Sequence, residues 1–135
     1  MSTNRIKSYG KLVIETEISG AKKLFKTINS DFAKVISKLS KIKGKVIITG
    51  VGKSGHIASK ISSTMSSTGT LSQYCSPTDM SHGDLGIISK NDAIIIISNS
   101  GKSEEFKSLL DFAKKNKVFV IGITSNAKST LYKLC

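Results

Sequence analysis

Several residue types are scarce in this 135-residue sequence: tryptophan is absent, proline occurs once and cysteine occurs twice. Cys75 and Cys135 lack the paired spacing of a metal site and a secretory context, so we expect two free thiols. No stretch approaches the roughly 20 apolar residues that span a membrane, and residues 1–11 lack the apolar run of a secretion signal. These absences predict a single soluble domain over residues 1–135, located in the cytoplasm.

Arginine is also nearly absent, although the chain is strongly basic. Twenty-one basic residues stand against nine acidic ones, which gives a net charge of +12, and only Arg5 is an arginine. Such a charge suggests that the protein binds a nucleic acid or a membrane surface. Base recognition depends on the arginine fork, however, and single-strand binding depends on aromatic side chains, which make up only 6% of the sequence. The composition therefore predicts no nucleic-acid or membrane partner, and a lysine-rich surface whose field favours anionic metabolites such as sugar phosphates.

The spacing of apolar residues divides the chain into helical and strand-like parts. Helical spacing predicts helices over residues 5–27 and 30–42, with capping residues at 29–31. Apolar runs then predict strands at 46–49, 71–75, 93–97 and 118–123, with helical stripes between them and a last helix from near Lys128. The fold class expected is α/β: a three-layer αβα, flavodoxin-like, doubly wound parallel sheet of about four strands, with an N-terminal helix pair. A long loop is expected at roughly 76–85 and is expected to be functional.

A glycine-rich turn follows the first predicted strand. Residues 50–55 match the pattern G-x-G-x-x-G, which in this place suggests a dinucleotide site. That site also needs an acidic residue about 20 positions on, but the second strand ends without one and the next acid is Asp79. A P-loop is excluded because Ile47 stands where its first glycine belongs. The turn is therefore interpreted as a general anion cradle, with Lys53 as an added charge.

The third predicted strand leads into a serine-rich loop, residues 98–105, which opens another helix. Its hydroxyls and free backbone N–H groups suit a phosphate. Alternatively, Ser100 or Ser103 simply caps the helix, and taken alone the two interpretations are equal. The first and third strands flank the switch point of a doubly wound sheet, where ligands bind. We therefore favour a ligand site formed by the two turns.

His82 lies in the predicted long loop that enters the third strand. A single histidine is more often structural than catalytic. Imidazole suits proton transfer near neutral pH, however, which makes His82 a candidate for acid–base work beside a first-turn carboxylate. Only packing decides whether it reaches the cleft.

Four motifs together carry a family resemblance: Gly-Val-Gly-Lys-Ser-Gly-His at 50–56, Ser-Thr-Gly-Thr at 67–70, Ser-His-Gly-Asp-Leu-Gly at 81–86 and Ser-Asn-Ser-Gly at 98–101. In order and spacing they resemble the sugar isomerase (SIS) domain of the D-arabinose 5-phosphate isomerases. The resemblance implies interconversion of D-ribulose 5-phosphate and D-arabinose 5-phosphate, for 3-deoxy-D-manno-octulosonate and lipopolysaccharide biosynthesis. It implies an enediol mechanism and no cofactor. A metal site is not expected, because Ser76 replaces a histidine that relatives link to zinc.

The resemblance also implies roles for individual residues. Carried over by position, the catalytic residues are Lys53, His82 and Glu105. The substrate-binding residues are Gly52, Ser54, Gly69, Thr70, His82, Asn99, Ser100, Gly101 and Ser103.

Relatives continue past the end of this chain with more of the domain and a regulatory domain pair, so the resemblance implies a partial SIS domain. A homo-oligomer is expected because relatives associate through SIS domains and the apolar stripe from Ile6 to Ile42 offers an interface. The alternative function is a non-catalytic sugar-phosphate-binding module or the remnant of a truncated gene. A flavodoxin-like domain with empty loops ranks last.

Overall fold

A computed structural model of the chain describes residues 2–102 and 104–135. It forms two compact units, Met1–Ser40 and Lys41–Cys135, which are described separately. No helix in the described part of the chain is both long enough and apolar enough to cross a bilayer. The two thiols are free as predicted, with Cys75 buried and Cys135 exposed.

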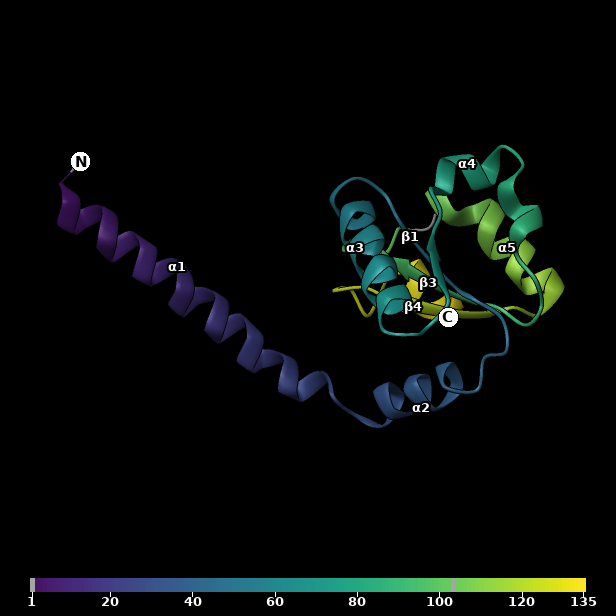
Figure 1. The fold of residues 1–135 in the computed structure, drawn as a ribbon, viewed down its shortest axis with the longest axis horizontal. Helices are drawn as coiled ribbons and strands as arrows, with labels where there is room; N and C mark the ends of the chain where they lie inside the picture. Colours follow the sequence, from purple (N-terminus) through teal and green to yellow (C-terminus); the bar gives the residue numbers. More distant parts are fainter. Residues whose placement is uncertain (1, 103) are drawn as a thin grey trace. The chain divides into compact units, whose positions relative to one another are not determined.

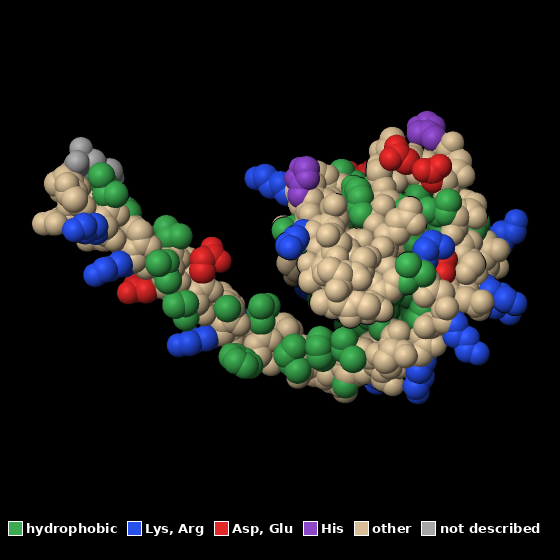
Figure 2. Space-filling model, in the orientation of Figure 1, with side chains coloured by type: hydrophobic (Ala, Val, Ile, Leu, Met, Phe, Trp, Pro, Cys, Tyr) green, Lys and Arg blue, Asp and Glu red, His purple; other side chains and the backbone are tan. Residues whose placement is uncertain are grey.

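The first unit consists of α1 (Thr3–Lys23), the 3₁₀ turn η1 (Leu24–Thr27) and α2 (Ser30–Leu39). The predicted break is confirmed: the Asn29 side chain accepts hydrogen bonds from the N–H groups of Asp31 and Phe32, at 3.0 and 3.1 Å. The second helix ends at Leu39, before the predicted position 42. None of the residues of these elements is buried. Large apolar side chains therefore stay exposed along this unit (Figure 2), among them Ile6, Leu12, Val13, Ile18, Phe25, Ile28, Phe32 and Ile36.

The second unit contains a four-stranded parallel sheet in the order β2-β1-β3-β4. Its strands are β1 (Val46–Gly50), β2 (Ser72–Tyr74), β3 (Ala93–Ile97) and β4 (Phe119–Ile123). Its helical elements are α3 (Lys53–Ser67), α4 (Pro77–Ser81), η2 (Asp84–Ile87), η3 (Glu104–Phe106), α5 (Lys107–Asn116) and α6 (Thr130–Leu134). Figure 1 shows α3 on one side of the sheet and α4 with α5 on the other. The predicted doubly wound α/β architecture is confirmed.

The two central strands hold the core. All five residues of β1 and the first four of β3 are buried, which explains why Thr49 is the one polar residue in these two strands, because a strand covered on both faces has no side toward water. One apolar cluster joins the sheet to the helices: Ile47, Ile94, Ile96, Met80, Phe106, Leu109, Ala113 and Leu131. Fully burying one such large side chain stabilises the fold by about 1.5–3 kcal/mol.

The predicted long loop was wrong in one respect, because most of it is helical. It contains α4 and η2, and Pro77 stands in the first turn of α4, where its missing N–H has no helical partner to lose. Met80, only 1% exposed, anchors α4 in the core. Packing of the buried side chains of Pro77 and Met80 therefore orders a segment whose composition resembles a loop.

Candidate functional site

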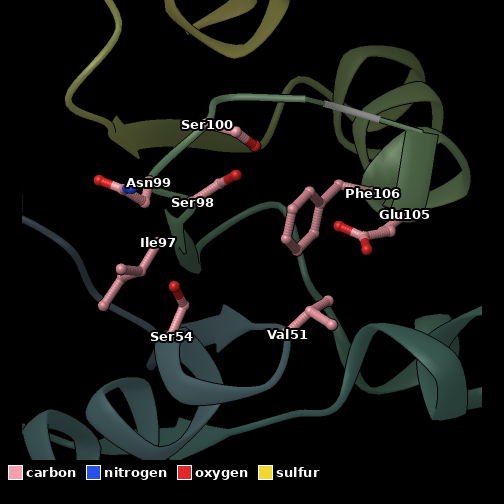
Figure 3. Close-up of a pocket in the computed structure, with 8 residues that line it drawn as sticks. All are labelled: Val51, Ser54, Ile97, Ser98, Asn99, Ser100, Glu105 and Phe106. Carbon is pink, nitrogen blue, oxygen red and sulfur yellow. The ribbon is translucent and has the colours of Figure 1, made fainter.

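A cleft of about 270 Å³ opens at the carboxyl edge of the sheet, between the ends of β1 and β3. From β1 the chain crosses to β2 on one side, whereas β3 leads to β4 on the other, so this is the predicted switch point. The cleft is lined by Val51, Ser54, Ile97, Ser98, Asn99, Ser100, Glu105 and Phe106 (Figure 3). The glycine turn and the serine loop therefore share one cleft, as the sequence predicted.

The glycine turn supplies one wall of the cleft. Gly52 caps α3 with φ of 56° and has no side chain with which to satisfy the first N–H groups of the helix. The Ser54 N–H donates to the Val51 carbonyl at 3.1 Å, and the other N–H groups of this turn have no partners within the helix, so these remain available to an anion. The turn also brings α3 close to β1: a Cβ at Gly50 would lie 2.8 Å from the carbonyl carbon of Ser54. This close approach holds the Ser54 hydroxyl at the cleft.

The serine loop supplies the second wall and is fixed from behind by the segment that follows β4. The Ser125 hydroxyl donates to the Asn99 carbonyl at 2.7 Å, and the Leu131 N–H donates to the Gly101 carbonyl at 3.1 Å. The Gly101 N–H in turn donates to the Ser98 hydroxyl at 3.1 Å. Gly101 has φ of 66°, and a Cβ there would overlap the Ser129 side chain, so only glycine fits. The loop is thus held in one conformation before a ligand binds.

The polar groups in the cleft divide into two kinds. Figure 3 shows the hydroxyls of Ser54, Ser98 and Ser100 facing a common space, whereas the Asn99 amide points away from it. The Glu105 carboxylate lies next to the Phe106 ring, on the side of the ring away from these hydroxyls in this view. Hydroxyls and helix N–H groups suit a phosphate, whereas a carboxylate repels one and suits proton transfer. The arrangement can therefore hold the phosphate of a small molecule at one end and move a proton at the other.

The structure brings only some of the predicted site residues to this cleft: Ser54, Asn99, Ser100 and Glu105 line it. Gly52 and Lys53 lie beside it in the glycine turn, with Lys53 exposed at the first position of α3, and Gly101 lies buried behind the serine loop. Ser103 lies outside the described residues.

His82 does not line the cleft. It is exposed at the end of α4, where its backbone N–H donates to the Asp79 carbonyl at 3.0 Å. Its catalytic role stays a prediction.

Gly69 and Thr70 lie at the opposite edge of the sheet. They follow the last turn of α3, and the adjoining Leu71 carbonyl accepts a hydrogen bond from the N–H of Val46, the first residue of β1. A 15-residue helix spans roughly 22 Å, which separates them from the cleft of their own chain. Their proposed contact with the sugar also stays a prediction.

The sequence did not single out Val51, Ile97 and Phe106 as lining residues, whereas Ser98 belongs to the predicted serine loop. Phe106 is 1% exposed, and its apolar side chain belongs to the core. Its position in the sequence could have identified it, because it directly follows Glu105. A large apolar residue there is expected to be buried and to hold the neighbouring carboxylate in place. Within residues 2–102 and 104–135, no group of three histidine, cysteine or acidic side chains is placed to hold a metal ion.

Comparison with known proteins places this site in a family. Residues 38–135 match the model of the SIS domain. Arabinose 5-phosphate isomerase KdsD of Yersinia pestis is 42% identical over 124 residues, which is 92% of this chain and 38% of that protein. The KdsD protein of Francisella tularensis is 46% identical over 118 residues, which is 85% of this chain and 36% of that protein.

A solved structure agrees with these relatives. The protein c3406 of Escherichia coli CFT073, determined in complex with arabinose 5-phosphate, is 36% identical and matches with a TM-score of 0.92, covering 100% of this chain and 72% of that chain. This chain spans about two-fifths of the length of the curated relatives it matches. Since the SIS model covers most of the sequence and the fold agrees throughout, the chain belongs to the SIS domain family.

Proposed function

We propose that the cleft binds a pentose 5-phosphate and that the chain belongs to an aldose–ketose isomerase that interconverts D-ribulose 5-phosphate and D-arabinose 5-phosphate. The observation that carries the proposal is the division of the cleft into a hydroxyl-lined end and a carboxylate end. The names of the relatives, arabinose 5-phosphate isomerase, and the sugar-phosphate complex of the related structure support this substrate class.

The phosphate would sit against the serine loop and the start of α3. Ser54 and Ser100 would donate hydrogen bonds to its oxygens, together with free N–H groups of the first helical turn. The exposed ammonium of Lys53, at the start of the same helix, would add attraction for the dianion. Ser103 and Asn99 are proposed as further substrate contacts by resemblance.

The sugar would extend from the phosphate toward Glu105. Starting from the ketose, a base removes a proton from C1 while the C2 carbonyl oxygen gains a proton, which gives the enediol. A proton then adds to C2 and the O1 hydroxyl loses its proton, which gives the aldose without net oxidation or reduction. We assign the base role to Glu105, the stabilisation of the enediolate oxygen to Lys53 and a second acid–base role to His82.

Two further parts of the proposal concern the location and the assembly of the protein. Phosphorylated pentoses are cytoplasmic metabolites, and the route to lipopolysaccharide would use D-arabinose 5-phosphate there. We also propose a homo-oligomer, because the exposed apolar side chains of α1, η1 and α2 need a partner surface to become buried.

A second candidate is a binding module that does not catalyse. It is favoured by the observation that Glu105 is the one ionisable side chain lining the cleft among the described residues. The two candidates differ in turnover and agree in binding.

Kinetics on the full chain test the proposal. With D-ribulose 5-phosphate as substrate, Glu105→Gln is expected to lower kcat by about 10²–10⁴-fold and to leave the affinity for D-arabinose 5-phosphate nearly unchanged, because one acid–base group is lost. Glu104→Gln is the matched control, since this neighbour carries the same charge but does not line the cleft. Binding without turnover in the wild type would support the module, and absence of binding would refute both candidates.

A further inference from the structure

A second hollow, of about 370 Å³, lies at the opposite edge of the same sheet. It is formed by the segments that lead into β1, β3 and β4, whereas the phosphosugar cleft is formed by segments that leave β1 and β3. The five-residue strands between the two edges span roughly 17 Å. The two hollows therefore belong to different sites of the second unit. The lining residues are Lys41, Ile42, Lys43, Lys90, Asn91, Asp92, Lys117 and Phe119.

Lysines make up half of this lining, compared with about one residue in seven of the whole sequence. The single acidic member of the lining is Asp92, which is 2% exposed and already engaged. Its carboxylate accepts hydrogen bonds from the Lys45 ammonium at 2.8 Å, the Lys45 N–H at 2.9 Å and the Ser89 N–H at 2.8 Å. Asp92 therefore has little capacity left to neutralise the four lysines around it.

Those four lysines, at positions 41, 43, 90 and 117, are left without counter-charges. Across the described ranges, none of them forms an ion pair with an acidic side chain. The four side chains are exposed around an open hollow, where like charges repel one another and salt screens part of the repulsion. The repulsion among the four lysines is unfavourable in the absence of a ligand. A bound anion would replace it with a net attraction.

The backbone conformation of Lys117 also supports an anion site at this hollow. Its φ is 55°, and it is the one non-glycine residue with positive φ among those that the structure describes. It ends α5 in the position where glycine is the usual residue, because a side chain there is strained. Solubility does not require a lysine at a strained position, since Lys114 and Lys115 already place positive charge in the last turn of α5. The strain is explained if the ammonium of Lys117 has a ligand to meet.

We propose that this lysine hollow binds a multiply charged anion of the polyphosphate class, either an inorganic polyphosphate or the phosphate chain of a nucleotide. A compact chain of two or three phosphates matches the charge of four lysines around one hollow better than a single phosphate, which one or two ammonium groups satisfy. The site is one of binding, and it lies apart from the proposed chemistry at Glu105.

The test is titration calorimetry of the full chain with inorganic triphosphate. We expect saturable binding that saturating D-arabinose 5-phosphate does not displace, and that weakens by about tenfold or more in Lys90→Gln/Lys117→Gly, since each charged contact is worth about tenfold. Lys117→Gly also removes the backbone strain, so its Tm should equal or exceed that of the wild type, which excludes unfolding as the cause of lost binding. The control Lys60→Gln/Lys107→Gln removes the same net charge at exposed positions of the second unit that do not line the hollow, and should change the affinity by less than about twofold.

The remaining outcomes separate the sources of the anion and decide against the proposal. ATP that binds as tightly as triphosphate indicates recognition of the phosphate chain alone, whereas tighter binding of ATP indicates a nucleotide site. Equal losses in the two double variants would assign the effect to the general positive field and overturn the proposal. Displacement of triphosphate by D-arabinose 5-phosphate would show that triphosphate binds in the phosphosugar cleft. Binding only to a long single-stranded oligonucleotide would indicate a nucleic-acid surface. Each of these two results would overturn the proposal.

Discussion

Gly101 provides the sharpest test of how the serine loop is held at the cleft. Substitution by alanine places a Cβ against the Ser129 side chain and 2.8 Å from the Thr124 hydroxyl. It also puts a side chain on a backbone with φ of 66°. The left-handed conformation costs roughly 1–2 kcal/mol for a residue with a Cβ. Overpacking of a close contact costs roughly 1–3 kcal/mol more.

Gly101→Ala is therefore expected to lower the free energy of unfolding by about 2–5 kcal/mol. A double variant separates the two contributions. Ser129→Gly removes the obstructing side chain and should alone cost only a few tenths of a kcal/mol, because glycine is tolerated at the helix cap that Ser129 provides for α6. Gly101→Ala/Ser129→Gly should then recover the overpacking part, about 1–3 kcal/mol, and leave the backbone part.

Urea denaturation of the three variants and the wild type measures these free energies. The affinity for D-arabinose 5-phosphate should fall with the loss of the loop conformation in Gly101→Ala and return in part in the double variant. A change in unfolding free energy below about 0.5 kcal/mol for Gly101→Ala, or no recovery in the double variant, would refute the packing argument.

Three further predictions concern the site, the sheet and the first unit. Ser100→Ala should weaken binding of D-arabinose 5-phosphate by about tenfold to a hundredfold, since a hydrogen bond to a charged group is worth about 1.5–3 kcal/mol, whereas Ser108→Ala, an exposed serine on α5, should leave calorimetric affinity unchanged. Burial opposes ionisation of Asp92, but hydrogen bonds from Lys45 and Ser89 outweigh it and hold the pKa of the carboxyl below its ordinary 3.8. The stabilisation from Asp92 is therefore present above that ordinary value and is lost as the pH falls through the folded-state pKa, so acid denaturation curves should show a component that Asp92→Asn removes. Phe25→Glu, at a side chain 79% exposed, should shift light scattering toward smaller species, and an unchanged mass would count against the first unit as the interface.

The sequence predicted the sheet and its switch point because the signals there are local and physical. The runs at residues 46–50 and 93–97 are apolar except for Thr49, and the glycines at positions 50 and 55 allow a helix to approach a strand closely. These features are common to doubly wound folds, so the switch point between the first and third strands and the position of the cleft followed from them.

The parts that the sequence missed depend on contacts between distant segments. The helical state of residues 77–81 depends on burial of Met80, and the serine loop depends on Ser125 and Ser129, which are more than 20 residues away along the chain. His82 has the residue type that proton transfer needs, but α4 ends with its side chain exposed. A family motif reports that residues occur together in sequence, and it does not report which of them meet within one chain.

Proton exchange at the sugar tests the central claim most directly. When D-arabinose 5-phosphate is incubated with the full chain in D₂O, proton NMR should show loss of the C2 proton signal as deuterium enters through the enediol. The rate should fall by about 10²–10⁴-fold in Glu105→Gln, while the ligand-induced rise in Tm remains. Binding without any exchange in the wild type, or exchange that Glu105→Gln leaves unchanged, would contradict the assignment of the cleft as an isomerase site with Glu105 as its base.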